Sequence, residues 1–471
     1  MIHKIILIKM LRKMWGKYMS VQEIEQFKKI GMGVGIGFLI FAISLTLFNT
    51  TQASLLGVIA FLVVLWTNEG LPLAVVSLLP IILFPAFSII DTKTTALNYS
   101  NPIIYLFLGG FMIAIAVEKT NLHTWIANKM LDIFPNTPRG MIFSLAMTSG
   151  ILSSILSNTT TSLLLMSIAL FITKDVQLKL RFALAIAYGA SVGGIITPIG
   201  TPPNLILLGV MNDKSMEMIP FFQWIWMVAP LAFLMFIAVS SLLSLGLENT
   251  PIKREANESL LTKPQKKVLY IIGGLILLLL LNAPINPYWG GLGLNEASLL
   301  LMAGLMLFMS PFNILDWMED KAKIPYRIMF LFGAGFSIAK AFGDTGLASE
   351  VASYLIVMTE LHPILLLFSV AALITFTTEI TSNTALISIM LPVIYSVAEQ
   401  TGINTTLFMM VATLCASYAF MLPIATPPNA IAMSSGAVDV KSMMKYGFVL
   451  NLVGIFLIVV IAEYFWKGIL S

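Results

Sequence analysis

The sequence has few charged residues. Only 11% of its 471 residues are Asp, Glu, Lys or Arg, whereas soluble domains carry about 25%. With 58% hydrophobic residues and a mean hydropathy of +0.92, the composition is typical of a protein with many membrane spans. The net charge of +4 is modest, and its basic residues gather near the ends of apolar runs, which argues against nucleic-acid binding.

Cysteine and histidine are also scarce. Cys415 is the one cysteine, so an internal disulfide is excluded, and its apolar neighbours predict a small buried side chain. The three histidines, His3, His123 and His362, are isolated and form no group with metal-ligand spacing. GxGxxG, P-loop and HExxH motifs are missing, as are an Asp pair and a Ser/His dyad. These absences argue against an enzyme and against an organic cofactor.

Apolar runs recur along the chain, and several reach the roughly 20 residues that a helix needs to cross a bilayer. They cover 31–48, 53–66, 71–90, 103–117, 181–196, 222–246, 268–284, 297–310, 328–342, 404–422 and 447–466. We therefore expect an all-α polytopic protein of the lipid bilayer with about 11 transmembrane helices.

Basic residues predict the orientation. Residues 1–30 carry Lys and Arg interleaved with apolar and aromatic side chains, which is typical of an uncleaved, amphipathic segment at the membrane interface. Their excess places the N-terminus in the cytoplasm, and the basic connection 247–267 is expected on the same side. We expect a multi-pass protein of the cell inner (plasma) membrane.

The strongest feature is an internal repeat with an offset of 225 residues. Three motif pairs share it: Gly-Phe at 110–111 and 335–336, Ser-Asn-Thr at 157–159 and 382–384, and PIGTPPN at 198–204 with PIATPPN at 423–429. One shared offset without a gap indicates two structural repeats, roughly 53–246 and 267–466, after one extra N-terminal helix. About five crossings separate the two Ser-Asn-Thr motifs. An odd number predicts a 5+5 inverted-topology repeat, which is a hallmark of secondary transporters.

The Ser-Asn-Thr motifs predict two re-entrant hairpins. Each lies in a segment, 140–176 or 363–400, that is long enough for two half-crossing helices but is interrupted by small polar residues. Non-helical backbone at membrane depth occurs only where protein or a water-filled cavity covers it. The alternative is that Ser, Thr and Asn only join neighbouring helices. Two polar runs at equal offset favour hairpin tips, whose helix ends attract ions.

The PIGTPPN motif predicts a broken helix at 181–211. Two adjacent prolines cannot continue a helix, and Gly200 lets the backbone approach a ligand. A simple kink is the alternative. Because the heptapeptide is duplicated along with the polar tip, we expect each tip to face an unwound helix, and each such pair to form half of one site.

These paired signatures resemble the divalent anion/sodium symporter family, and the resemblance covers about 31–466. Family members move di- or tricarboxylates, or sulfate in some branches. The resemblance implies a homodimer that carries a succinate, malate or fumarate-class dicarboxylate with Na⁺ by an elevator mechanism. A sodium-independent dicarboxylate exchanger and a sulfate or tricarboxylate transporter of the same fold are the alternatives. A channel reading lacks a ring of charges or a filter.

The resemblance also implies parts and ligands. The parts are a basic N-terminus and first helix (1–52), scaffold segments (53–135 and 267–358), transport segments (136–246 and 359–471) and a cytoplasmic linker (247–266). The expected substrate ligands are Asn158, Thr159, Thr201, Pro202, Ser382, Asn383, Thr384, Thr426 and Pro427. The expected sodium ligands are Ser153, Ser157, Asn158 and Gly200 in one site, and Thr378, Thr381, Asn383 and Ala425 in the other.

The charge pattern gives a reason for co-bound cations. The motifs contain no Arg or Lys to neutralise a dianion, so Na⁺ would supply that charge and couple binding of the two solutes. Glu379 lies three residues before Ser382, and we expect it to accept hydrogen bonds from a backbone amide or a hydroxyl; a role beside the cation is the alternative. Lys340 and Asp344 are expected to pair along one helix.

Overall fold

The computed structural model describes residues 21–248, 251–252, 260–283, 289–355 and 362–470. Every regular element within these ranges is a helix, which confirms the expected all-α class. The chain divides into two compact units. Unit 1 comprises Met1–Tyr99 and Tyr326–Leu347, and unit 2 comprises Ser100–Pro325 and Ala348–Ser471.

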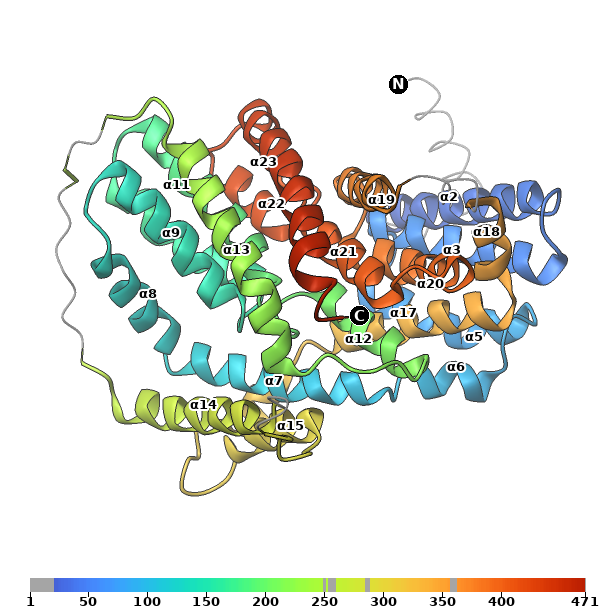
Figure 1. Ribbon diagram of the computed structural model, residues 1–471, viewed down its shortest axis with the longest axis horizontal. Helices are drawn as coiled ribbons and strands as arrows, with labels where there is room; N and C mark the ends of the chain where they lie inside the picture. Colours follow the sequence, from blue (N-terminus) through green and yellow to red (C-terminus); the bar gives the residue numbers. More distant parts are fainter. Residues whose placement is uncertain (1–20, 249–250, 253–259, 284–288, 356–361, 471) are drawn as a thin grey trace. The chain divides into compact units, whose positions relative to one another are not determined.

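The helices of each unit are labelled in Figure 1. Unit 1 contains α2 (Val21–Ser44), α3 (Thr50–Asn68), α4 (Leu73–Leu78), α5 (Pro80–Ala86), α6 (Thr92–Asn98) and α17 (Tyr326–Asp344). Unit 2 contains α7 (Pro102–Lys119), α8 (Leu122–Ile133), α9 (Pro138–Ser153), α10 (Asn158–Ile172), α11 (Val176–Gly194), α12 (Pro202–Asp213), α13 (Phe221–Ser244), α14 (Lys263–Asn282), α15 (Glu296–Met306), α16 (Trp317–Asp320), η1 (Lys321–Lys323), nearly all of α18 (Leu347–Leu355), α19 (Pro363–Thr378), α20 (Asn383–Thr401), α21 (Thr405–Ser417), α22 (Pro427–Ser434), α23 (Val440–Ile461) and the π-helical turn η3 (Ala462–Trp466).

Seven helical stretches within the described ranges are long and apolar enough to cross a membrane. They are Gln22–Ser44, Thr50–Asn68, Thr92–Lys119, Phe221–Ser244, Lys263–Asn282, Asn383–Thr401 and Val440–Trp466. Other expected spans form shorter apolar helices, among them Glu296–Met306, Pro363–Thr378 and Thr405–Ser417. The chain is therefore an integral membrane protein. Residues 1–20 of the expected interfacial segment lie outside the described residues, and Val21 begins a helix that continues into the first span.

In unit 1, α2 and α3 cross at glycines. A Cβ atom on Gly37 would lie 2.9 Å from the carbonyl oxygen of Gly57, and one on Gly57 would lie 2.8 Å from Cβ of Phe41. Helices in membranes associate through such small residues because their backbones can then approach closely. α17 contacts α4, α5 and α6, and the Ser337 hydroxyl donates to the carbonyl oxygen of Gly333 at 2.8 Å.

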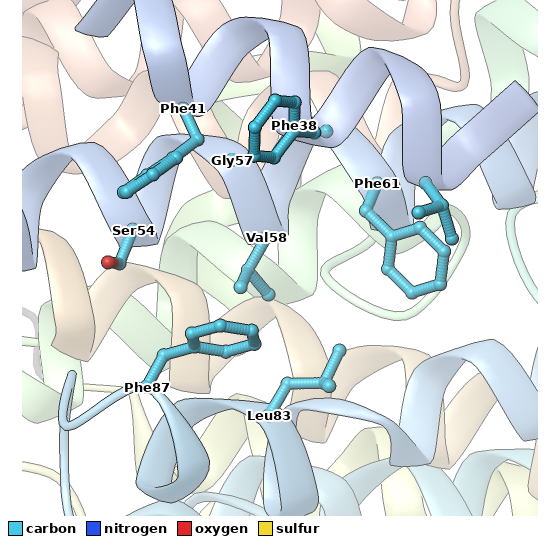
Figure 2. Close-up of a pocket in the computed structure, with 10 residues that line it drawn as sticks. Phe38, Phe41, Ser54, Gly57, Val58, Phe61, Leu83 and Phe87 are labelled. Carbon is cyan, nitrogen blue, oxygen red and sulfur yellow. The ribbon is translucent and has the colours of Figure 1, made fainter. Parts of the chain in front are cut away.

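An apolar cavity of about 420 Å³ lies beside α2, α3 and α5 in unit 1 (Figure 2). Phenylalanine rings form much of its wall, including Phe38, Phe41 and Phe87, and Ser54 supplies its one hydroxyl. An anion placed there would lose its hydration without gaining donors. This cavity is therefore not a candidate for the anion site.

In unit 2, α9, α11 and α13 run side by side (Figure 1). A Cβ atom on Gly193 would lie 2.1 Å from Cα of Gly150, and one on Gly150 would meet the Phe236 ring at 2.1 Å. Larger side chains at these glycines would push the helices apart. The glycines therefore position the end of α11, where the expected break begins.

The two faces of the unit 2 bundle follow from chain direction. The span α13 ends at Ser244 and the span α14 begins at Lys263, so both meet the linker on one face of the membrane. The other ends of these spans, Phe221 and Asn282, lie on the opposite face. α7 ends on the linker face, because Gln265 Nε2 donates to the Thr120 carbonyl oxygen at 3.1 Å.

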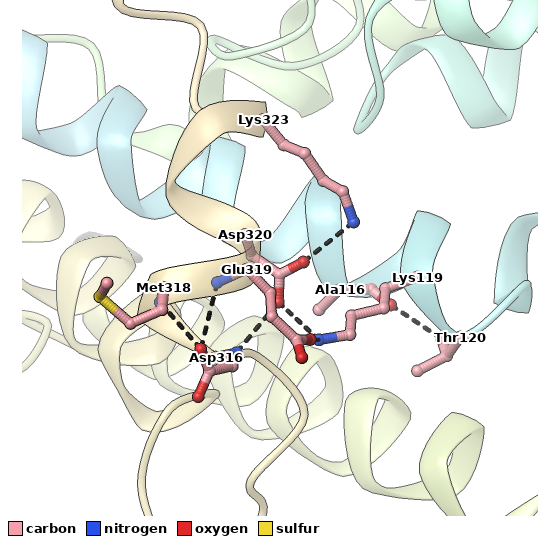
Figure 3. Close-up of polar contacts among 8 residues, drawn as sticks. All are labelled: Ala116, Lys119, Thr120, Asp316, Met318, Glu319, Asp320 and Lys323. Atoms are coloured by element: carbon pink, nitrogen blue, oxygen red, sulfur yellow. Dashed lines mark hydrogen bonds and ion pairs between the residues drawn. The ribbon is translucent and has the colours of Figure 1, made fainter.

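An ionic cluster fastens the linker-face end of α7 (Figure 3). Asp320, with only 2% of its side chain exposed, accepts from Lys119 at 2.6 Å and from Lys323 at 2.9 Å. Burial by itself would raise the pKa of Asp320, but hydrogen bonds from Lys119, the Asp316 amide and Lys323 outweigh it and lower the pKa to about 2. The expected pair of Lys340 and Asp344 is confirmed at 2.8 Å.

Candidate functional site: two tips and two helix breaks

Two short interruptions lie where the sequence predicts hairpin tips. Tip 1, residues 154–157, separates α9 from α10, and tip 2, residues 379–382, separates α19 from α20. α9 contacts α10 and α19 contacts α20, as the arms of a hairpin do. Adding 225 to the last residue of α9 and to the first of α10 gives the same boundaries in the second half.

Each tip is held by the same internal hydrogen bond. Ser153 Oγ donates to Asn158 Oδ1 at 2.5 Å, and Thr378 Oγ1 donates to Asn383 Oδ1 at 2.7 Å. Both hydroxyl-bearing side chains are fully buried, whereas the asparagines are half-buried. Because the amide oxygen is the acceptor in both pairs, the N–H groups of each asparagine are left to donate to another group. Such donors suit a carboxylate.

The helices that leave the tips differ in their caps. Ser157 Oγ accepts from the Thr160 amide at 3.1 Å and donates to Thr160 Oγ1 at 2.9 Å. Ser382 occupies the same position before α20 but makes no side-chain capping bond. Both serines are exposed, and both precede the N-terminal amides of a helix, where an anion is favoured.

Both expected broken helices are present, so the kink alternative is wrong. Break 1, residues 195–201, separates α11 from α12, and break 2, residues 418–426, separates α21 from α22. Each break ends on an extended threonine: Thr201 has φ −145° and ψ 146°, and Thr426 has φ −141° and ψ 149°. The proline pair that follows begins the next helix, because a proline lacks the N–H that the first turn does not need.

An asparagine closes each break. Asn204 Nδ2 donates to the Thr197 carbonyl oxygen at 2.9 Å, and Asn429 Nδ2 donates to the Leu422 carbonyl oxygen at 3.0 Å. Within the described residues, the Oδ1 atoms of both asparagines are buried without a hydrogen-bond partner. Neither asparagine was among the expected ligands, although both end the duplicated motif. Their conservation of position between the halves was the signal.

Break 1 folds tightly onto the end of α11. A Cβ atom on Gly200 would lie 2.3 Å from the Gly194 carbonyl oxygen, and one on Gly194 would lie 3.0 Å from Asn158 Oδ1. Of the first expected sodium set, Ser153, Asn158 and Gly200 therefore gather around Gly194, and Ser157 lies at the exposed end of the tip.

The second expected sodium set is arranged similarly. Thr378 Oγ1 lies within hydrogen-bond distance of the Ala416 carbonyl oxygen, at 2.9 Å, as well as of Asn383. Ala425 is buried in break 2. Thr381 differs, because its hydroxyl donates to the Thr377 carbonyl oxygen at 2.8 Å within the end of α19.

The expected ligands also differ in depth. Ser153, Gly200, Thr201, Thr378, Thr384, Ala425 and Thr426 are buried; Asn158, Thr159, Pro202, Thr381 and Asn383 are half-buried; Ser157, Ser382 and Pro427 are exposed. The more accessible residues are thus mainly those of the tips, which is the order expected for a solute that enters over them.

Glu379 acts as a structural partner in tip 2. Its carboxylate accepts from the Met421 and Leu422 amides at 2.9 and 3.0 Å and from Asn451 Nδ2 at 2.7 Å. The structure thus shows the first of the two roles expected for this residue. The sequence did not predict that Asn451, on α23, would be one of its partners.

The two halves interlock in unit 2. α10 and α11 of the first half contact α22 of the second, and α20 and α21 contact α12. Both tips and both breaks therefore belong to one core. Within residues 153–159, 194–204, 378–384 and 418–429, Glu379 is the one charged residue, and its carboxylate already has three donors. An anion here would meet amides, hydroxyls and helix ends without any basic side chain.

The same lining suits an alkali cation. The described residues contain no group of three His, Cys, Asp or Glu side chains that could hold a metal ion. Hydroxyl, amide and carbonyl oxygens around Gly194 and Ala416 are hard ligands, which favour a hard cation such as Na⁺ over a transition metal.

The sequence profile of a family described as citrate transporter matches residues 61–412. The chain belongs to the citrate transporter family. Two curated relatives agree with this family. The sodium-dependent dicarboxylate transporter SdcS of Staphylococcus saprophyticus is 29% identical over 98% of this chain and 96% of its own. SdcS of Staphylococcus aureus is 30% identical over 93% of this chain and 92% of its own. The resemblance seen in the sequence is confirmed, and this member of the citrate transporter family is a membrane transporter and not an enzyme.

Two solved structures share the fold. The YdaH transporter of Alcanivorax borkumensis has a TM-score of 0.58 at 15% identity, over 80% of this chain and 88% of its own. MtrF of Neisseria gonorrhoeae has a TM-score of 0.57 at 13% identity, over 79% and 82%. At such identities the comparison concerns the fold alone, which extends beyond close sequence relatives of the citrate transporter family.

Proposed function

We propose that this protein is a sodium-coupled symporter of dicarboxylates of the succinate, malate and fumarate class. The observation that carries the proposal is the pair of matching half-sites, each with a hydroxyl-bound asparagine, an unwound helix and no basic residue. The relatives named as sodium-dependent dicarboxylate transporters support the choice of solutes.

The anion lies between the two tips. Asn158 and Asn383 donate to its carboxylates through their amide N–H groups, which the Ser153 and Thr378 bonds leave available. Thr159, Ser382 and Thr384 add hydroxyls, and the proline-led starts of α12 and α22 add positive helix ends beside Thr201 and Thr426. Neutral donors alone do not balance two negative charges.

Sodium ions supply the missing charge. One ion takes Ser153, Ser157, Asn158 and the Gly200 carbonyl oxygen as ligands. The other takes Thr378, Thr381, Asn383 and the Ala425 carbonyl oxygen. Each asparagine thereby links a cation to the anion, so that binding of one solute favours binding of the other.

Alternating access follows from an inverted repeat. The matching helix boundaries of the two halves support this topology, since +225 relates the starts of α9, α10 and α12 to those of α19, α20 and α22. The segments 136–246 and 359–471 move as a transport part against the scaffold segments in an elevator motion. We propose a homodimer in the inner (plasma) membrane with a cytoplasmic N-terminus.

Uptake into proteoliposomes tests the proposal. Radiolabelled succinate should accumulate when Na⁺ is high outside and low inside, and should fail to accumulate when K⁺ replaces Na⁺. Uptake that ignores the sodium gradient but needs an anion inside would instead identify an exchanger. Competition by succinate, citrate and sulfate ranks the substrates; citrate is the second candidate because the family is described as a citrate transporter.

Substitutions test the site. Asn158→Ala or Asn383→Ala should abolish uptake while the protein still inserts and dimerises. Asn136→Ala is the matched control, because this exposed residue precedes α9 outside the site. Uptake at the wild-type rate in both tip variants would refute the assignment of the site, whereas sodium-independent uptake would refute the coupling.

A further inference from the structure

A second polar cavity lies in unit 2, with a volume of about 290 Å³. The starts of α7, α13 and α15, the ends of α12 and α14, and break 1 form its walls. Its polar side chains are Asn212, Asn282, Asn295 and Glu296. This set shares no residue with the tips.

Glu296 is the one ionisable residue that lines this cavity. Its Oε2 atom accepts from the Phe221 amide at 2.8 Å. Its Oε1 atom is buried and has no hydrogen-bond partner within the described residues. An ionised oxygen without water or a partner is costly to bury, so Oε1 calls for a ligand that carries positive charge or donates a hydrogen bond.

The rest of the lining is rich in acceptors. Lys, Arg and His are missing from the residues that form it. Pro102, Pro198 and Pro220 line the cavity, and each offers a carbonyl oxygen but no N–H. The three asparagines add amide oxygens. One carboxylate with neutral oxygens is the ligand type that hard cations prefer.

We propose that this cavity binds a small monovalent cation through Glu296, with Na⁺ as the ion to which the chain is exposed in transport. The cavity has room for the ion with several of its waters, since one water takes about 30 Å³ of liquid. The site is additional to the two sodium sites of the tips, and it does not depend on their assignment.

The place of the cavity gives the ion a role. Phe221 and Asn282 lie on the face opposite the linker, so the cavity is on that face, and Pro198 extends its wall to break 1. A cation held there neutralises Glu296 and lies between one membrane face and the first half-site. The negative charge thereby raises the local concentration of cations beside break 1.

Equilibrium binding of ²²Na⁺ to the purified full-length protein tests the proposal. Glu296→Gln should lower the saturable amount by one Na⁺ per chain relative to wild type. Glu217→Gln is the matched control, because it removes the same charge from an exposed position in the same connection between α12 and α13 and should leave the amount unchanged. In a background of Asn158→Ala with Asn383→Ala, Glu296→Gln should again remove one Na⁺.

Two further measurements keep the outcome decisive. If Glu296→Gln fails to insert, Asn212→Ala, at an exposed residue of the cavity wall, should weaken ²²Na⁺ binding several-fold. Unchanged binding in a folded Glu296→Gln protein would overturn the proposal and leave only water in the cavity. Sodium-independent succinate uptake, with loss of one Na⁺ in Glu296→Gln, would refute the symport and retain the cavity site.

Discussion

The two halves of the site have the same backbone plan but are stabilised by different groups. In the first half, Thr197 Oγ1 donates to the Ser154 carbonyl oxygen at 2.5 Å and joins break 1 to tip 1. The positions 225 residues later are Leu422 and Glu379, and there the backbone amide of the break donates to a carboxylate at 3.0 Å. One tip is thus tied to its break by a main-chain acceptor, and the other by a charged side chain.

Glycine use differs between the halves as well. Gly194 and Gly200 meet at the end of α11, where a Cβ on Gly200 would collide with the backbone. Ala419 and Ala425 occupy the same positions in the second half. A duplicated geometry therefore tolerates divergence wherever the local spacing does. The halves need not contribute equally to stability or to binding.

The largest effect is expected for Glu379→Ala. The change leaves two backbone N–H groups and the Asn451 amide without their charged acceptor, so the free energy of unfolding should fall by about 3 kcal/mol. Ser154→Ala, at the matching position, should cost under about 1 kcal/mol, because its carbonyl oxygen and not its hydroxyl ties the tip to the break. Denaturant unfolding of purified protein measures both; equal losses would remove the contrast between the halves.

Gly200→Ala should be the next most damaging change. The new methyl group would lie 2.3 Å from the Gly194 carbonyl oxygen, and backbone displacement there should cost about 2 kcal/mol or more and reduce uptake at least tenfold. The reverse change in the other half, Ala425→Gly, should cost about 1 kcal/mol at most. Thermal unfolding and succinate uptake would show whether break 1 is the less tolerant of the two.

Asp320 extends the comparison to the ends of the matching helices α7 and α17. Lys119 pairs with buried Asp320, whereas the position 225 residues later, Asp344, pairs only with Lys340 along its own helix. The lowering of the Asp320 pKa from 3.8 to about 2 corresponds to about 2 kcal/mol of stability. Because the folded state holds the proton less tightly, this contribution is present above pH 3.8 and is lost as the pH falls through about 2. Asp320→Asn should therefore lower the melting temperature at pH 7 and lose its effect in acid, while Asp344→Asn should cost about 0.5 kcal/mol or less.

The smallest effect is expected for Gly194→Ala. Its methyl group would lie 3.0 Å from Asn158 Oδ1, so the asparagine must shift by a few tenths of an ångström. We expect KM for the anion to rise several-fold with a cost in stability of about 1 kcal/mol, whereas Ala419→Gly should leave KM unchanged. A change in the maximal rate without a change in KM would assign Gly194 to helix packing and not to the position of Asn158.

Particular residues show how far the sequence could be interpreted. The offset between Asn204 and Asn429 predicted two matching breaks, because adjacent prolines exclude a helix whatever surrounds them. The partner of Glu379 could not be predicted, since Asn451 lies 72 residues away on another helix. Glu296 gave no sequence signal either, because its environment comes from five helices and a break that meet only in the folded chain.

The sequence by itself determined that this is a helical membrane protein built from two related halves, and where each tip and each break begins. Those features are local, since they depend on proline, glycine and capping residues that act within a few positions. Only the tertiary structure decided that a carboxylate supports one half and close glycine contacts the other, and that an acceptor-rich cavity surrounds Glu296. Such contacts arise from the packing of helices distant in the chain, and no spacing in the sequence encodes which side chains will meet.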